Sequence, residues 1–73
     1  MYKINPQYLD RFKKRYYTYA YSFGKGIYLE FDKDSLTYIG IELFYQPFTR
    51  DYERKAEELL SELFSKGILE FID

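Results

Sequence analysis

The chain has 73 residues, no cysteine, no histidine and a net charge of −1, and 23% of its residues are aromatic. This length allows one compact domain, which we expect to span residues 1–73. The lack of cysteine excludes disulfide bonds, and the lack of both residue types excludes the common structural zinc sites. The fold must therefore be stabilised by packing, to which aromatic side chains contribute large buried areas, or by self-association.

The charges are divided unevenly along the chain. Residues 1–25 carry six Lys or Arg and one acid, a net charge of +5, whereas residues 26–73 carry five Lys or Arg and eleven acids, a net charge of −6. This asymmetry fits either a basic surface for an acidic partner or an ordinary solvated surface. No apolar run reaches the roughly 20 residues of a membrane span, and no signal peptide is evident. We expect a cytoplasmic protein without a membrane partner.

The first element is expected to be a short helix. Asn5 is a favourable N-cap, and Pro6 suits the first helical position. Apolar side chains follow at helical spacing as far as Tyr16. The basic run at residues 13–15 then has to connect this helix to the first strand.

Three strands and a second helix are expected to follow. Alternating apolar residues predict strands over about residues 16–23, 27–32 and 36–45, with turns at residues 24–26 and 32–35. Pairing Leu29 with Ile39 brings the apolar faces of the last two strands together, and it sets Tyr28 against Gly40.

The C-terminal part predicts a long helix and a last strand. Thr49 suits the N-cap of a helix over residues 50–66, and Gly67 suits its left-handed end. Residues 68–72 are typical of a short fourth strand. The predicted fold class is α+β with the order α-β-β-β-α-β. Its three- to four-stranded, mainly antiparallel sheet carries the C-terminal helix on one face.

Aromatic residues occupy every second position of the first strand, at Tyr17, Tyr19, Tyr21 and Phe23. A two-residue hairpin turn sends these tyrosines to the sheet face away from the C-terminal helix. There, six aromatics would form a patch of about 600 Å², which is large for a monomer. A three-residue loop pairs Tyr21 with Leu29 instead and puts the tyrosines in the core. Both registers stay open, because a shift of one residue turns every side chain to the other face.

The sequence carries no catalytic or metal-binding motif. Histidine and cysteine, the commonest general base and the strongest protein nucleophile, are absent. Glu30, Asp32 and Asp34 lack the spacing of a calcium loop and are expected to be turn acids. The segment at residues 24–26 is too short for a phosphate-binding loop. We expect no enzyme activity and no cofactor.

Protein binding is the function that the composition favours. Tyrosine supplies large, rigid, amphipathic contact area, and protein interfaces are enriched in it. We expect a non-enzymatic module with a protein partner, and self-association into a homodimer stays open. The predicted contact residues combine the tyrosines with two cations at their rim. They are Lys14, Arg15, Tyr17, Tyr19, Tyr21, Tyr28 and Tyr38.

In small size, acidity and lack of catalytic groups, the chain resembles the small inhibitors and adaptors encoded by phages and mobile elements, anti-CRISPR proteins among them. The likeness is one of general character and has no shared motif. It implies a protein that acts by occluding the surface of its partner.

Single-stranded nucleic-acid binding is the alternative. The basic run at residues 13–15 leads into the tyrosine row, and such binders combine cations for phosphates with aromatic rings for stacking. Glu30, Asp32 and Glu42 would share a sheet face with these tyrosines and repel phosphates. The signature of RNA-recognition domains is also missing.

Overall fold

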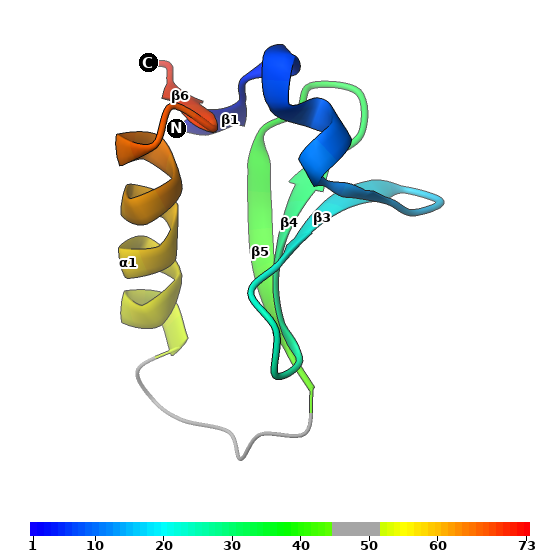
Figure 1. The fold of residues 1–73 in the computed structure, drawn as a ribbon, viewed down its shortest axis with the longest axis vertical. Coiled ribbons are helices and arrows are strands. Elements are labelled where there is room, and N and C mark those ends of the chain that lie inside the picture. The colour runs from blue at the N-terminus through cyan, green and yellow to red at the C-terminus, as the bar shows by residue number, and fades with distance from the viewer. Residues whose placement is uncertain (45–51) are drawn as a thin grey trace.

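The computed structural model describes residues 1–44 and 52–73. Its elements follow one another along the chain as β1 (Tyr2–Ile4), the 3-10 helix η1 (Pro6–Arg11), β2 (Lys13–Lys14), β3 (Thr18–Ser22), β4 (Ile27–Asp32), β5 (Tyr38–Leu43), α1 (Tyr52–Ser65) and β6 (Leu69–Phe71). A four-stranded antiparallel sheet has the order β2-β3-β4-β5, and β1 and β6 form a second, two-stranded antiparallel sheet. Helix α1 lies along one face of the larger sheet (Figure 1). The predicted α+β class is confirmed.

The hydrophobic core lies between α1 and the larger sheet. Buried side chains at helical spacing on α1, namely Ala56, Leu60 and Leu63, form one side of it. Leu29 and Phe31 of β4 form the other side and are fully buried. The remaining members close the end of the core that lies beside the smaller sheet; they are Ile4, Phe12, Ile68 and Leu69. Burying several large aliphatic and aromatic side chains is the main stabilising term open to so small a chain.

The β3–β4 hairpin adopts the register of the three-residue loop. Tyr21 pairs with Leu29 and Tyr19 with Phe31. The loop is closed by two hydrogen bonds, from the amide of Phe23 to the carbonyl of Ile27 (2.9 Å) and from the amide of Ile27 to the carbonyl of Gly24 (3.1 Å). Tyr19 and Tyr21 therefore share the face of Leu29 and Phe31 and pack on the core. Of the two registers left open by the sequence, this is the one that turns Tyr19 and Tyr21 toward the core, whereas Tyr17 stays exposed.

The predicted pairing of β4 with β5 was wrong by two residues. Leu29 pairs with Ile41 instead of Ile39, and Tyr28 pairs with Glu42 instead of Gly40. The ladder shifts between Glu30 and Phe31, so β5 carries one extra residue there. This bulge leaves Ile39 57% exposed, although the alternation of the sequence had placed it in the core.

The N-terminal helix is shorter than predicted. Asn5 is its N-cap, as expected, and its side-chain oxygen accepts a hydrogen bond from the amide of Gln7 at 3.1 Å. The chain then turns to extended geometry at Phe12, whose ring packs edge-on against those of Tyr21 and Phe31. The placement of Tyr16 on this helix was therefore wrong. The basic segment that follows is strand β2, which pairs with β3.

Helix α1 ends as its sequence predicts. Gly67 has a φ of 79°, and the amides of Gly67 and Ile68 donate to the carbonyls of Phe64 and Leu63, which is the Schellman arrangement. The expected N-cap, Thr49, lies outside the described residues. No helix within residues 1–44 and 52–73 has the length and apolarity needed to cross a bilayer.

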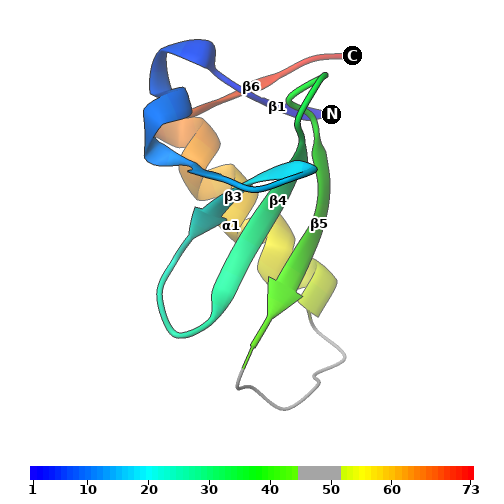
Figure 2. The same cartoon turned by 90° about the vertical axis from the view of Figure 1, so that its right-hand side faces the viewer.

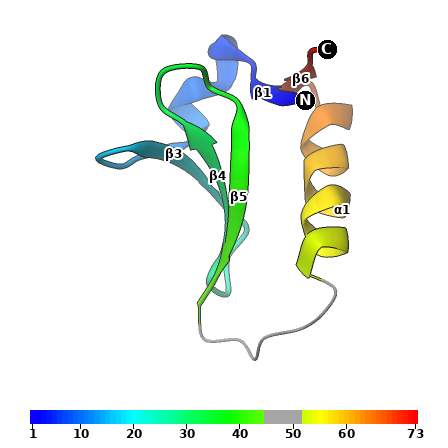
Figure 3. The ribbon, with the colours of Figure 1, turned by 180° about the vertical axis from the view of Figure 1, so that it is seen from behind.

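The C-terminal strand β6 does not join the larger sheet. It pairs with β1, so that Tyr2 faces Phe71 and Ile4 faces Leu69 (Figure 3). Strand β1, which the sequence analysis did not predict, is itself held to the chain before β5 by a hydrogen bond from the amide of Ile4 to the carbonyl of Leu36 at 2.8 Å. Strand β6 thus pairs with the edge of β1 and not with a strand of the larger sheet.

Candidate functional site

The β2–β3 hairpin projects from the larger sheet on the side opposite α1 (Figures 1 and 2). Its turn is closed by a hydrogen bond from the amide of Arg15 to the carbonyl of Thr18 at 2.8 Å. Tyr16 and Tyr17 occupy the turn and are 81% and 78% exposed. Their ring centres are 4.4 Å apart, in an edge-to-face arrangement. The hairpin therefore presents a pair of aromatic rings to solvent.

A lysine at the same end of the sheet, directly after β4, fixes the backbone of this turn. Lys33, which follows β4, donates through Nζ to the carbonyl oxygens of Arg15 (3.1 Å) and Tyr16 (3.3 Å). These carbonyls belong to the turn itself, so the ammonium group takes part in holding its shape. Holding the turn lowers the conformational entropy that a partner would have to remove on binding.

The side chain of Arg15 ties the turn to the sheet. Its Nη1 donates to carboxylate oxygens of Glu30 and of Glu42, the latter at 2.9 Å. Its guanidinium carbon also lies 4.9 Å from the centre of the Tyr28 ring. The side chain of Glu30 is only 13% exposed, so this is a partly desolvated cluster in which one cation serves two carboxylates. Arg15 thus anchors the hairpin and is engaged within the molecule.

The two carboxylates of this cluster differ in their acidity. Burial, followed by the neighbouring Glu42, raises the pKa of Glu30. Burial acts in the same direction on Glu42, but hydrogen bonding with Arg15 and Glu30 outweighs it and lowers the pKa of Glu42. The pKa of Arg15 is raised, chiefly by its hydrogen bond to Glu42, so its charge is secure. On acidification, Glu30 therefore takes up a proton before Glu42 does.

The predicted contact residues do not form one surface. Tyr19 and Tyr21 pack on the core on the α1 side of the sheet. Tyr28 lies on the other side beneath Arg15, and Tyr38 packs against Phe31 in the core. Only Lys14 and Tyr17 are exposed together on the hairpin.

The exposed part of the hairpin also contains residues that the predicted set lacked. Lys13 is exposed in β2, and Tyr16 lies beside Tyr17 at the tip. No Gly, Pro, Asn or Asp stands between residues 12 and 18, so the usual signal for a turn is missing there. Lys33 contacts the carbonyls of Arg15 and Tyr16, which precede it by 18 and 17 positions, and no local sequence pattern reveals contacts over that separation. We call Lys13, Lys14, Tyr16 and Tyr17 the hairpin tip.

Comparison of the chain with protein-family models, with curated proteins and with solved structures gave no match. The case for a function therefore depends on the geometry of the described residues.

Proposed function

We propose that this protein is a small non-enzymatic protein-binding module whose hairpin tip contacts the partner. The observation that supports this most directly is the exposed tyrosine pair at the tip, fixed by the two hydrogen bonds of Lys33. Rings exposed to this degree contribute little to the stability of their own fold, because they bury little area.

Tyrosine is enriched among the residues that contribute most to protein–protein affinity. It offers large contact area with few rotatable bonds, and its hydroxyl group can hydrogen-bond at the rim of an interface. A turn that is held in place before binding gives up less entropy when the partner arrives. The tip combines both properties.

The charges around the tip suggest the character of the partner surface. Lys13 and Lys14 are exposed beside the tyrosines, whereas the charge of Arg15 is neutralised by Glu30 and Glu42. The partner surface is therefore proposed to be an acidic cavity wide enough to take the rings of Tyr16 and Tyr17. Filling such a cavity would block it, which is how a cytoplasmic phage or mobile-element inhibitor of anti-defence type would act.

A photo-crosslinking experiment tests this proposal. A benzoylphenylalanine residue is placed at position 17 in one sample and at position 64 in another, since Phe64 is exposed on α1, on the other side of the sheet. We expect position 17 to crosslink one protein and position 64 to crosslink none. The partner is identified by mass spectrometry, and its affinity is then measured with purified components.

In that measurement, the double substitution Tyr16→Ser with Tyr17→Ser should weaken binding by about 100-fold or more, as expected when two central aromatic contacts are lost. The circular dichroism spectrum and the urea midpoint should stay unchanged. The matched control Phe64→Ser should bind normally. Undiminished binding by the double variant would overturn the proposal.

Single-strand nucleic-acid binding is the second candidate, because exposed lysines stand beside exposed tyrosines on the same tip. A labelled mixed-sequence oligonucleotide would be titrated at roughly 50 mM and roughly 200 mM salt, where phosphate-driven binding weakens strongly. Binding with that salt response, lost on Lys13→Gln with Lys14→Gln, would favour this candidate over a protein partner. No binding at the lower salt concentration would remove it.

A further inference from the structure

Strand β5 forms an edge of the larger sheet within the described residues. Strand β1 pairs with the chain immediately before β5, through the bridge between Lys3 and Thr37. Beyond that bridge, β5 and the N-terminal half of α1 enclose a groove of about 740 Å³. Its walls come from residues 38–41 of the strand and from residues 52–54, 56 and 57 of the helix.

The free side of β5 offers backbone groups for pairing. The amide of Phe44 donates to the carbonyl of Gly26 at 2.8 Å, so it points toward β4. Because backbone groups alternate in direction along an antiparallel strand, those of Ile41 and Leu43 point away from β4, to the open edge. Unpaired edges of this kind accept an additional strand from another chain.

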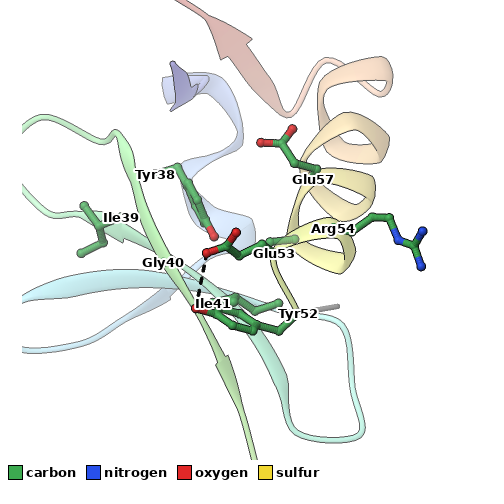
Figure 4. Close-up of a pocket in the computed structure, with 9 residues that line it drawn as sticks. Tyr38, Ile39, Gly40, Ile41, Tyr52, Glu53, Arg54 and Glu57 are labelled. Atoms are coloured by element: carbon green, nitrogen blue, oxygen red, sulfur yellow. Dashed lines mark hydrogen bonds between the residues drawn. The ribbon is translucent and has the colours of Figure 1, made fainter. Parts of the chain in front are cut away.

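The helix wall of the groove is acidic. Figure 4 shows the side chains of Glu53 and Glu57 pointing from α1 into the space between helix and strand, with Tyr38 opposite them. Ile39 and Arg54 point away from this space. Burial raises the pKa of the Tyr38 hydroxyl, and the negative charges of Glu57 and Glu53 raise it further. The groove therefore has a negative potential beside an apolar floor that includes Ile41 and the buried Ala56.

We propose that this groove binds an extended basic segment of a protein partner, which adds to β5 as a further strand. The backbone of the segment pairs with Ile41 and Leu43. Alternate side chains of an added strand point toward α1. Lysine or arginine at those positions lays its aliphatic stem on the apolar floor and brings its charge to Glu53 and Glu57.

A second copy of the chain fits this edge poorly. Antiparallel pairing of two β5 edges about a two-fold axis would bring both α1 helices to the same face, beside one another. The acidic walls formed by Glu53 and Glu57 would then meet, at a cost in like-charge repulsion. A single extended segment avoids that cost and neutralises the wall. The groove lies on the α1 side of the sheet, whereas the hairpin tip projects from the other side, so the two surfaces can be tested separately (Figures 1 and 4).

The first test uses a fluorescein-labelled peptide of seven residues in which valine and lysine alternate. Its binding to the whole protein is followed by fluorescence anisotropy at low salt. The substitutions Glu53→Gln and Glu57→Gln together should weaken binding about tenfold or more, because charge-assisted contacts are lost. The matched control, Glu58→Gln with Glu70→Gln, removes the same charge from exposed positions outside the groove and should leave the affinity unchanged.

The second test separates strand pairing from simple charge attraction. A peptide of the same sequence is N-methylated at the amides that would pair with β5, which keeps its charge and removes those donors. We expect its affinity to fall about tenfold or more, since each lost main-chain bond leaves a partner group unsatisfied. Amide NMR signals of Ile41 and Leu43 should shift with the unmodified peptide alone.

Two outcomes overturn the proposal. One is the absence of binding at millimolar peptide; the other is equal binding by the groove variant, the control variant and the methylated peptide. Sedimentation that shows a dimer dispersed by Ile41→Lys would assign the edge to a second copy instead. The variant Tyr16→Ser with Tyr17→Ser should still bind the peptide, so failure of the hairpin proposal leaves this one standing.

Discussion

The guanidinium carbon of Arg15 lies 4.9 Å from the centre of the Tyr28 ring, while the same side chain donates to Glu30 and Glu42. One residue of the hairpin turn thus contacts both β4 and β5. The exposed tyrosine pair is carried by a segment without a core of its own. Its position relative to the sheet therefore depends on this cluster and on Lys33.

Replacing Arg15 by methionine keeps the stem of the side chain and removes the charge. The carboxylates of Glu30 and Glu42 are then left side by side, and Glu30 is mostly buried. We expect a loss of about 1–2 kcal/mol in the free energy of unfolding at pH 7, a modest value because solvent reaches part of the cluster. Urea denaturation followed by circular dichroism measures this loss.

The second substitution Glu30→Gln should restore part of that stability, because it removes one of the two facing charges. In Arg15→Met alone, the pKa of Glu30 rises further above its unfolded value. A raised carboxyl pKa means that the folded state binds more protons, so the stability of this variant should increase as the pH falls from 7 toward the unfolded value. Strict additivity of the two substitutions would contradict this account of the cluster.

Tyr17 and Tyr21 occur in the same alternating row but should differ sharply on substitution. Tyr21 packs on the core and contacts the ring of Phe12, so Tyr21→Ser should cost about 2 kcal/mol. Tyr17 is exposed, so Tyr17→Ser should change stability by no more than about 0.5 kcal/mol. Paired urea titrations compare them, and equal midpoints would argue against the register of β3.

Gly24 and Gly26 have nearly the same positive φ, 79° and 77°, but different surroundings. A Cβ at Gly26 would lie 2.4 Å from the carbonyl oxygen of Phe44, whereas one at Gly24 would meet nothing within 4 Å. Alanine at Gly24 should therefore cost about 1–2 kcal/mol for its backbone geometry alone.

Alanine at Gly26 should cost more than alanine at Gly24, because the backbone at Phe44, directly after β5, has to move. Thermal unfolding of the two variants gives the difference. A Gly26→Ala protein as stable as Gly24→Ala would show that the backbone at Phe44 can shift at little cost in free energy.

Asp32 should make stability depend on pH in the acid range. Its carboxylate accepts hydrogen bonds from the amide and hydroxyl of Ser35 and from the amide of Asp34, and these lower its pKa below the ordinary value of 3.8. The folded state therefore binds fewer protons than the unfolded state. The stabilisation is present above that ordinary value and is lost as the pH falls through the lower, folded value.

Asp32→Asn, which does not titrate, should be less stable than the wild type at neutral pH. The gap between the two proteins should close on acidification. Urea midpoints between pH 7 and pH 2.5 check this, and a constant gap would show that the charge of Asp32 has no part in the turn.

Local signals in the sequence predicted several elements well. The range of β4 agrees with prediction, the cap at Asn5 is present, and α1 ends at Gly67 with the expected hydrogen bonds. Each of these depends on side-chain chemistry within a few residues of the element. The turn at residues 32–35 was predictable for the same reason.

The remaining features depend on residues far apart in the chain. The bulge that exposes Ile39 leaves the alternation intact on either side, so periodicity cannot reveal it. Tyr16 stands four residues after Phe12 and so fitted a helix, but Phe12 leaves the helix to enter the core. Arg15 donates to Glu30 and Glu42, which stand 15 and 27 residues later in the chain. The sequence therefore predicted the residue types of the candidate site, tyrosine and lysine, but only some of the residues that form it.

The small sheet of β1 and β6 has a consequence for how the chain folds. Its strands pair residue 2 with residue 71, so the pairing closes a loop that includes nearly the whole chain. Closing so large a loop is entropically costly unless the intervening residues are already compact. The β3–β5 meander, with short connections, should therefore form first. Ile4 and Leu69 are fully buried in the native state. Their contacts should form late, so they should change the folding rate little and should mainly lower the unfolding rate.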